Sequence, residues 1–168
     1  MIPTTREERR WFLRNLAQGL VDYSGAAEPP IPVEEILTHP PDLYQRDFGV
    51  VEMFSSLWDA TFARPLSQRG NIFVHTNLDA AKRRFALARE TLSALITSHH
   101  GRRMGLTDLL LPELRDSAEY FARVMVAPDL LVQAYREQGG DIDDFAETFE
   151  MPIEVAAARW EDHIPNGR

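Results

Sequence analysis

Cysteine is absent from this sequence of 168 residues. Its absence excludes disulfide bonds, thiolate metal ligands and a cysteine nucleophile. Long hydrophobic runs are also missing, since stretches such as Val124–Ala127 fall far short of the roughly 20 apolar residues that a transmembrane helix needs. The first ten residues, MIPTTREERR, carry charges where a secretion signal has an apolar core. We therefore expect a cytoplasmic protein with no membrane partner.

Positive charge is scarce, with 18 basic against 26 acidic residues and a formal net charge of -8. This balance opposes attachment to phosphate backbones. The segment Ile142–Asp162 has the outline of a helix-turn-helix, but between Asp141 and Asp162 the sequence holds eight acidic residues and only Arg159 as a base. We expect no direct nucleic-acid partner. The phosphate-binding and nucleophile-elbow motifs of common enzyme classes are missing as well.

The chain is long enough for one sizeable core, and 44% of its residues are hydrophobic. We expect a single domain over residues 1–168, with a C-terminal helix pair at 141–163 packed on it. Apolar residues at helical spacing and breaker residues between them predict the helices. These helices are expected at Thr5–Val21, around Val33–Leu37, and at Asp79–Thr97, Pro112–Val126, Pro128–Glu137, Ile142–Phe149 and Pro152–Asp162.

Between Leu43 and Val74 the apolar residues form short groups separated by glycine, serine and proline, which is typical of strands. The sequence Gln68-Arg69-Gly70-Asn71 is the best turn signal, and it would let Trp58–Phe62 pair antiparallel with Ile72–Val74. We therefore predict an α+β fold that is mostly helical and contains a small antiparallel sheet of about three strands.

Two motifs carry a resemblance to a known family. The segment Gly70–Asn77 is followed by Arg84-Phe-Ala-Leu-Ala-Arg-Glu-Thr-Leu-Ser93, and a second motif lies at Ala118–Pro128. These residues resemble the strand, active-site helix and second helix of the ImmA/IrrE zinc metallopeptidases. Pro29–Ile36 and Phe145–Arg159 match more weakly. The resemblance covers most of the chain and implies a zincin-like fold.

The chemistry of that family needs two histidines one helical turn apart to bind Zn²⁺, and a glutamate between them that takes a proton from the metal-bound water. The resemblance places Arg89 and Ser93 at the histidine positions and Glu90 at the general-base position. The family's third ligand, a glutamate, corresponds to Ser117. A guanidinium stays protonated and offers no lone pair to a cation. We therefore expect no metal and no cofactor here.

The surroundings of this former site can be predicted in part. We expect Ile72 and Val74 in an edge strand that either lines a cleft together with Asp116 and Glu119 or is an ordinary sheet edge. A salt bridge from Arg89 to Glu119 or Asp116 would stand where the family has its metal. Glu90 is also readable as an ordinary helix acid that pairs with a nearby arginine; the candidates are Arg83, Arg84 and Arg89.

The resemblance implies the leading hypothesis, a catalytically inactive relative of these peptidases that acts by binding a protein or peptide. Active members cleave helix-turn-helix repressors of bacteria and their mobile elements, so a bacterial helix-turn-helix regulator is the natural partner.

Two alternatives belong to other classes of protein. One is an active metal-dependent peptidase with Glu90 as its base and non-standard ligands drawn from His75, His99, His100 and Asp116. The other is a structural subunit that associates with itself through an exposed apolar face.

Overall fold

The computed structural model describes residues 5–54 and 57–165. It is mostly helical with one small sheet, which confirms the predicted α+β class. The elements in chain order are α1 (Arg6–Ser24), α2 (Val33–Thr38), η1 (Asp42–Tyr44), β1 (Phe48–Met53), β2 (Ala60–Ala63), β3 (Gly70–His75), α3 (Ala80–Thr97), α4 (His99–Arg103), α5 (Leu106–Leu110), η2 (Leu111–Glu113), α6 (Leu114–Val126), α7 (Asp129–Glu137), α8 (Ile142–Thr148) and α9 (Ile153–Glu161). Within the described ranges, no helix is long and apolar enough to span a bilayer.

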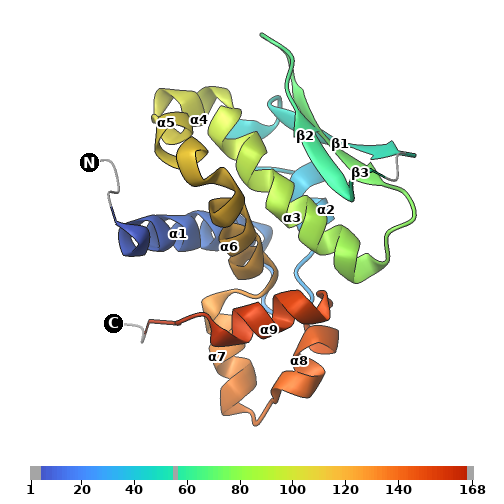
Figure 1. The fold of residues 1–168 in the computed structure, drawn as a ribbon, viewed down its shortest axis with the longest axis vertical. Coiled ribbons are helices and arrows are strands. Elements are labelled where there is room, and N and C mark those ends of the chain that lie inside the picture. The colour runs from blue at the N-terminus through green and yellow to red at the C-terminus, as the bar shows by residue number, and fades with distance from the viewer. Residues whose placement is uncertain (1–4, 55–56, 166–168) are drawn as a thin grey trace.

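Helix α3 lies at the centre of the molecule, with the sheet on one side and α6 on the other (Figure 1). Its buried face includes the predicted stripe Phe85, Leu92 and Leu95. On α6, Phe121 and Met125 are completely buried. These side chains form the core between the two helices, and α1 packs on α6 from outside (Figure 1).

The first helix shows how local sequence sets the boundaries of an element. Thr5 accepts a hydrogen bond from the backbone N–H of Glu8, and the Glu8 carboxylate accepts one from the backbone N–H of Thr5, which forms a capping box. Gly25 ends the helix with φ 73°, a left-handed conformation that glycine adopts without strain. The helix therefore extends one turn beyond the predicted end at Val21.

The sheet differs from the prediction in one respect: it is mixed rather than wholly antiparallel. Its strand order is β1-β3-β2, with β1 parallel and β2 antiparallel to β3. The predicted pairing of Trp58–Phe62 with Ile72–Val74 is confirmed in its core, because Ala60 faces Val74 and Phe62 faces Ile72. The prediction that Ile72–Val74 forms an edge strand is wrong, because β1 occupies the second side of β3.

The turn between β2 and β3 also lies earlier than predicted. The backbone N–H of Gln68 donates to the carbonyl of Pro65, and Ser67 adopts a positive φ of 59°. Gly70 belongs to β3 rather than to the turn. It must be glycine for another reason, since a Cβ there would lie 2.4 Å from the ring of Phe62.

The C-terminal helices are held by a buried arginine. Arg159 on α9 is completely buried, and its Nε donates to the carbonyl oxygen of Ala127 at 2.9 Å. It also forms an ion pair with Asp129 at the start of α7. Helices α8 and α9 pack on each other, and α9 contacts α6. The short helices α4 and α5 were not delimited from the sequence, because Gly105 at φ 71° divides a stretch too short for a clear periodic pattern.

Candidate functional site

Helix α3, which the resemblance aligns with the family's active-site helix, presents Arg89 and Glu90 toward β2. Asp79 caps the helix by accepting a hydrogen bond from the backbone N–H of Lys82. Two turns further on, Arg89 and Glu90 follow the buried face of α3, and about a fifth of each side chain remains exposed. Both side chains therefore lie at the border between the core and solvent.

Arg89 is fixed by an ion pair with two hydrogen bonds. Its two terminal nitrogens donate to the two carboxylate oxygens of Asp59, at 3.0 and 2.6 Å. This fork geometry is the strong form of an arginine–carboxylate pair. Arg89 pairs with neither Glu119 nor Asp116 in the structure, so the predicted salt bridge to one of these acids is wrong.

The partner Asp59 was missed by sequence reasoning. It precedes β2 and lies 30 positions before Arg89. Only the antiparallel pairing of β2 with β3 brings it beside α3, because the Asp59 carbonyl accepts from the backbone N–H of His75 at the end of β3. The one available signal was an acid inside the predicted strand Trp58–Phe62, directly before the observed start of β2 at Ala60.

Glu90 is tied to two neighbours. Its carboxylate accepts a hydrogen bond from Arg89 Nε at 3.2 Å and another from the backbone N–H of Phe62 in β2. Of the three predicted arginine partners, Arg89 is the one that it contacts. Arg83 binds acids elsewhere on the surface, and Arg84 reaches toward the C-terminal helices. Glu90 thus connects α3 to the edge strand of the sheet.

The charges of this ion cluster, formed by Asp59, Arg89 and Glu90, shift one another's titration. Burial alone would lower the pKa of Arg89, but Asp59 and Glu90 outweigh it and raise that pKa, so Arg89 stays charged. Burial would raise the pKa of Asp59, yet the hydrogen bonds and charge of Arg89 hold that pKa below its ordinary value. For Glu90 burial prevails over Arg89, and its pKa is raised.

The other two ligand positions hold serines in different surroundings. Ser93 is partly buried on α3, and its backbone carbonyl accepts from the Thr97 hydroxyl at 2.7 Å. Ser117 on α6 is buried, and its Oγ has no hydrogen-bond partner within the described structure. A serine hydroxyl is a weak substitute for an imidazole or carboxylate as a zinc ligand. Neither position therefore supplies a zinc ligand of the usual type.

The residues predicted to line a cleft do not do so together. Ile72 and Val74 are completely buried in the core, because β3 is the central strand and their side chains face inward. Their assignment to a cleft is therefore wrong. Asp116 is exposed and Glu119 is partly buried, and both border a groove between α1 and α6.

The histidines do not replace the missing ligands. His75 ends β3, and its Nδ1 accepts a hydrogen bond from the backbone N–H of Asn77. His99 and His100 belong to α4, where the ring of His100 packs edge-on against Tyr44. Across residues 5–54 and 57–165, no three histidine, cysteine, aspartate or glutamate side chains form a group that could hold a metal ion.

These residues do not fit the zinc that the resemblance implies. A zinc site needs three or more deprotonated nitrogen, oxygen or sulfur ligands around one point. Here the first ligand position carries a cation, Arg89, which two carboxylates hold in its charged form. The two acids of the cluster, Asp59 and Glu90, both pair with that same cation. The arrangement is an ion cluster that binds α3 to β2.

With this geometry in view, the comparisons with known proteins define the class. Residues 46–161 match the family described as Peptidase_M78, IrrE N-terminal-like domain. The match covers more than half of the chain, so the protein belongs to this family and the resemblance drawn from the motifs is confirmed.

A solved structure of a Mycobacterium tuberculosis transcriptional regulator shares the fold, with a TM-score of 0.63 and 17% sequence identity. The alignment covers 94% of the present chain but only 51% of the regulator, so the chain spans about half the length of that protein. No curated protein matches the sequence.

Proposed function

We propose that this protein is a catalytically inactive member of the IrrE N-terminal-like family that acts by binding a protein or peptide. The observation that carries the proposal is the ion pair between Arg89 and Asp59 at a position where active relatives need a zinc ligand. A guanidinium with a raised pKa remains a cation at any physiological pH, and it repels a divalent ion.

The retained Glu90 does not rescue catalysis. A general base in this chemistry acts on a water that the metal has made acidic. Without a metal the water keeps its ordinary, far weaker acidity. The Glu90 carboxylate also accepts hydrogen bonds from Arg89 and from the Phe62 backbone. Its role in the proposal is structural, namely to hold α3 against β2.

The surface near this cluster suits a binding role. Three large apolar side chains are exposed on the segment that leads from β1 to β2: Phe54, Leu57 and Trp58. Phe54 directly follows β1, and Leu57 and Trp58 directly precede Asp59. Exposed aromatic and aliphatic residues of this kind act as anchors in protein interfaces. A protein partner would contact these three side chains beside the ion cluster.

The partner that we propose is a bacterial helix-turn-helix regulator, met in the cytoplasm. Two findings support it: membership of a family whose active members cleave such regulators, and a fold shared with a transcriptional regulator. Binding without cleavage would leave the regulator intact and occupy one of its surfaces.

Metal analysis tests the inactive site directly. Protein purified without a metal-affinity column and dialysed against zinc should contain well under one zinc per chain by mass spectrometry. An enzymatically active relative with its histidines intact serves as the positive control. Stoichiometric zinc in the wild type that is lost in Glu90→Ala would refute the proposal.

A mixing experiment tests the binding role. The chain is combined with the helix-turn-helix regulator encoded beside its own gene, and the mixture is followed by light scattering after size exclusion and by intact mass. We expect a complex in which the regulator keeps its full mass, both in the wild type and in Glu90→Gln. Cleavage of the regulator into fragments, if a chelator prevents it, would show that the protein is an active metal-dependent peptidase instead.

A further inference from the structure

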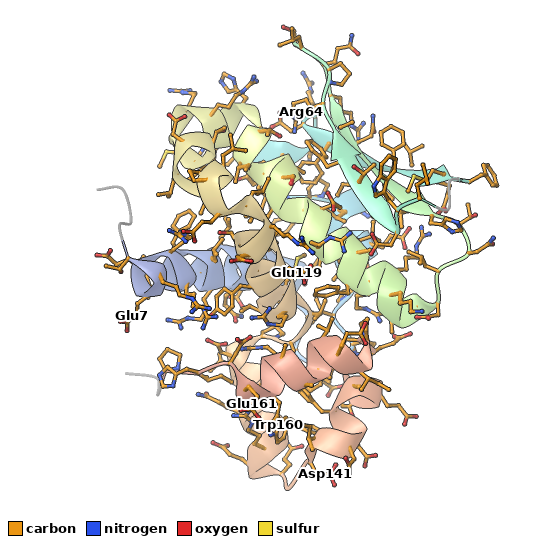
Figure 2. The ribbon with its side chains drawn as sticks, viewed as in Figure 1. Glu7, Arg64, Glu119, Asp141, Trp160 and Glu161 are labelled. Carbon is orange, nitrogen blue, oxygen red and sulfur yellow. The ribbon has the colours of Figure 1, made fainter. Side chains whose placement is uncertain are left out.

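A groove of about 200 Å³ lies between α1 and α6, away from the ion cluster. Figure 1 shows the two helices side by side, and Figure 2 shows Glu119 on α6 and Glu7 at the N-terminal end of α1. Arginines on one face of α1 form one wall, at Arg6, Arg9 and Arg10. Helix α6 forms the other wall and contributes the buried Ser117.

Two buried groups of this groove lack a hydrogen-bond partner within the part of the chain that the structure describes. They are Arg9 Nε and Ser117 Oγ. The Nε of an arginine can only donate, and a serine hydroxyl has a hydrogen to donate. A buried donor without an acceptor is costly, so native structures seldom keep one unless a ligand or water supplies the acceptor. An acceptor in the groove, from a ligand or a water, would satisfy these two donors.

Two of the four arginines that line the groove form no ion pair within the described residues. Arg9 forms an ion pair with Glu113, and Arg123 forms one with Asp162, so these two are neutralised. Arg6 and Arg10 form no ion pair with any residue of the described ranges.

Arg10 is held in place by an aromatic ring. Its guanidinium lies 4.6 Å from the centre of the Tyr120 ring, in a cation–π contact that leaves its N–H groups available. Arg123 lies 5.5 Å from the same ring centre, so two guanidiniums contact one tyrosine. The Tyr120 hydroxyl in turn accepts a hydrogen bond from Arg14, which fixes the ring. Arg10 is thus oriented before any ligand arrives.

We propose that this groove binds a phosphate group, free or esterified to a small molecule or side chain. Four donor groups lack an acceptor or counter-ion: Arg6, Arg10, Arg9 Nε and Ser117 Oγ. A phosphate offers three or four acceptor oxygens to such a set, whereas a carboxylate offers two. The volume suits one such group, since it lies below the roughly 300 Å³ at which pockets for drug-sized ligands begin.

Two carboxylates, Asp116 and Glu119, also border the groove and oppose an anion there. Their charges predict opposite effects of two kinds of variant on phosphate affinity. Removal of the Glu119 charge should strengthen phosphate binding, while removal of a guanidinium should weaken it. The groove includes Ser117, one of the three positions that correspond to metal ligands in the family, but not Arg89, Glu90 or Ser93. Its existence does not depend on whether the protein is catalytically inactive.

Isothermal titration of the full chain with inorganic phosphate, and separately with O-phosphoserine, tests the proposal. We expect saturable binding that weakens about tenfold in Arg10→Gln, since a charge-assisted hydrogen bond is lost. Glu119→Gln should bind more tightly than the wild type. Ser117→Ala should weaken binding without removing charge. The control is Arg103→Gln, which removes an exposed arginine from α4, outside the groove, and should leave affinity unchanged.

The two ligands distinguish the sources of the phosphate. Tighter binding of O-phosphoserine indicates an esterified phosphate, and equal or tighter binding of inorganic phosphate indicates the free ion. No binding of either ligand would overturn the proposal. So would equal affinities in the wild type, Arg10→Gln and Glu119→Gln, which would place the ion elsewhere on the surface.

Discussion

Asp59 and Arg89 each depend on the other for their place at the border of the core. Asp59 is 42% exposed and Arg89 20% exposed, so solvent screens the pair only in part. The bidentate hydrogen bonds fix the guanidinium plane between β2 and α3. The ion pair thus links α3 to the start of β2, as a metal ion shared between ligands would.

The pair should show up as a coupling energy. We expect Asp59→Asn to lower the free energy of unfolding by about 1 kcal/mol, because it leaves Arg89 with only Glu90 as an acid partner. In the double variant with Arg89→Gln the two losses should not add. Urea unfolding of all four proteins measures the cycle. Strictly additive losses would show that the ion pair contributes nothing to stability.

Glu90 gives a prediction about pH. Its pKa is raised in the folded protein, so its protonated form favours folding, and that stability is lost as pH rises through the raised pKa. Glu90→Gln removes this loss. The difference in free energy of unfolding, variant minus wild type, should therefore increase between about pH 4 and about pH 7.

Urea unfolding at the two pH values measures this difference. Asp59 has the opposite sign, because its lowered pKa gives stability that is lost as pH falls. Both proteins contain Asp59, so its contribution largely cancels in the comparison. A difference that stays constant or decreases with pH would contradict the raised pKa of Glu90.

Among the elements, β2 is the one whose surroundings most affect function. It lies at the edge of the sheet, and the Phe62 N–H that would otherwise be open to an added strand is hydrogen-bonded to Glu90. Helix α3 thereby protects part of that edge. The protection is a property of α3 and β2 together, since neither element closes the edge alone.

Hydrogen exchange measures the protection at a single amide. The Phe62 amide should exchange more slowly in the wild type than in Glu90→Ala, because the variant has no acceptor for it. The amides of the central strand β3 serve as the internal control and should be unaffected. Equal exchange at Phe62 in both proteins would show that Glu90 does not protect the edge.

Helix α9 depends on Arg159, which reaches Ala127 and Asp129 from a completely buried position. Arg159→Met keeps the apolar stem but leaves a buried carbonyl and a carboxylate without this donor. We expect it to lower the free energy of unfolding by about 3 kcal/mol in urea. Arg115→Met, at an exposed position of α6, is the matched control with little expected effect. Similar stabilities of the two variants would refute the anchoring role.

The helices could be predicted from sequence because their signals are local. Asp79 caps α3, and α7 ends at the predicted Glu137, with Gly139 at φ 84° just beyond it. The strand order could not, because it depends on which strand β1 pairs with, and the short apolar groups carry no such information. For the same reason the pairing of Arg89 with Asp59 escaped prediction. The identities of Arg89, Ser93 and Glu90 needed only the motif.

At the scale of the whole molecule, the net charge argues against DNA binding. The net charge is -8, and acidic residues outnumber basic ones in the helices α8 and α9. The similarity to a transcriptional regulator concerns about half of that protein and its fold. It therefore gives no reason to expect that the present chain binds DNA.

The expectation that this chain does not bind DNA can be tested by fluorescence anisotropy. A fluorescent DNA duplex in near-physiological salt should show no change in anisotropy up to about 10 µM protein, a range in which nonspecific binders with Kd near 10⁻⁶ M respond. A known helix-turn-helix regulator provides the positive control. Saturable binding that weakens with added salt would show that a cationic surface outweighs the net charge.

The link between Arg89 and Asp59 also opposes the introduction of a metal site at position 89 by a single substitution. A single histidine at position 89 would leave Asp59 without its cation. It would also remove the arginine that helps to hold Glu90 against the backbone of Phe62. One imidazole alone cannot retain zinc. Stability would fall before any metal affinity appeared. Each single substitution toward a metal centre would therefore lower the free energy of unfolding. Only simultaneous replacement at several positions would avoid that loss.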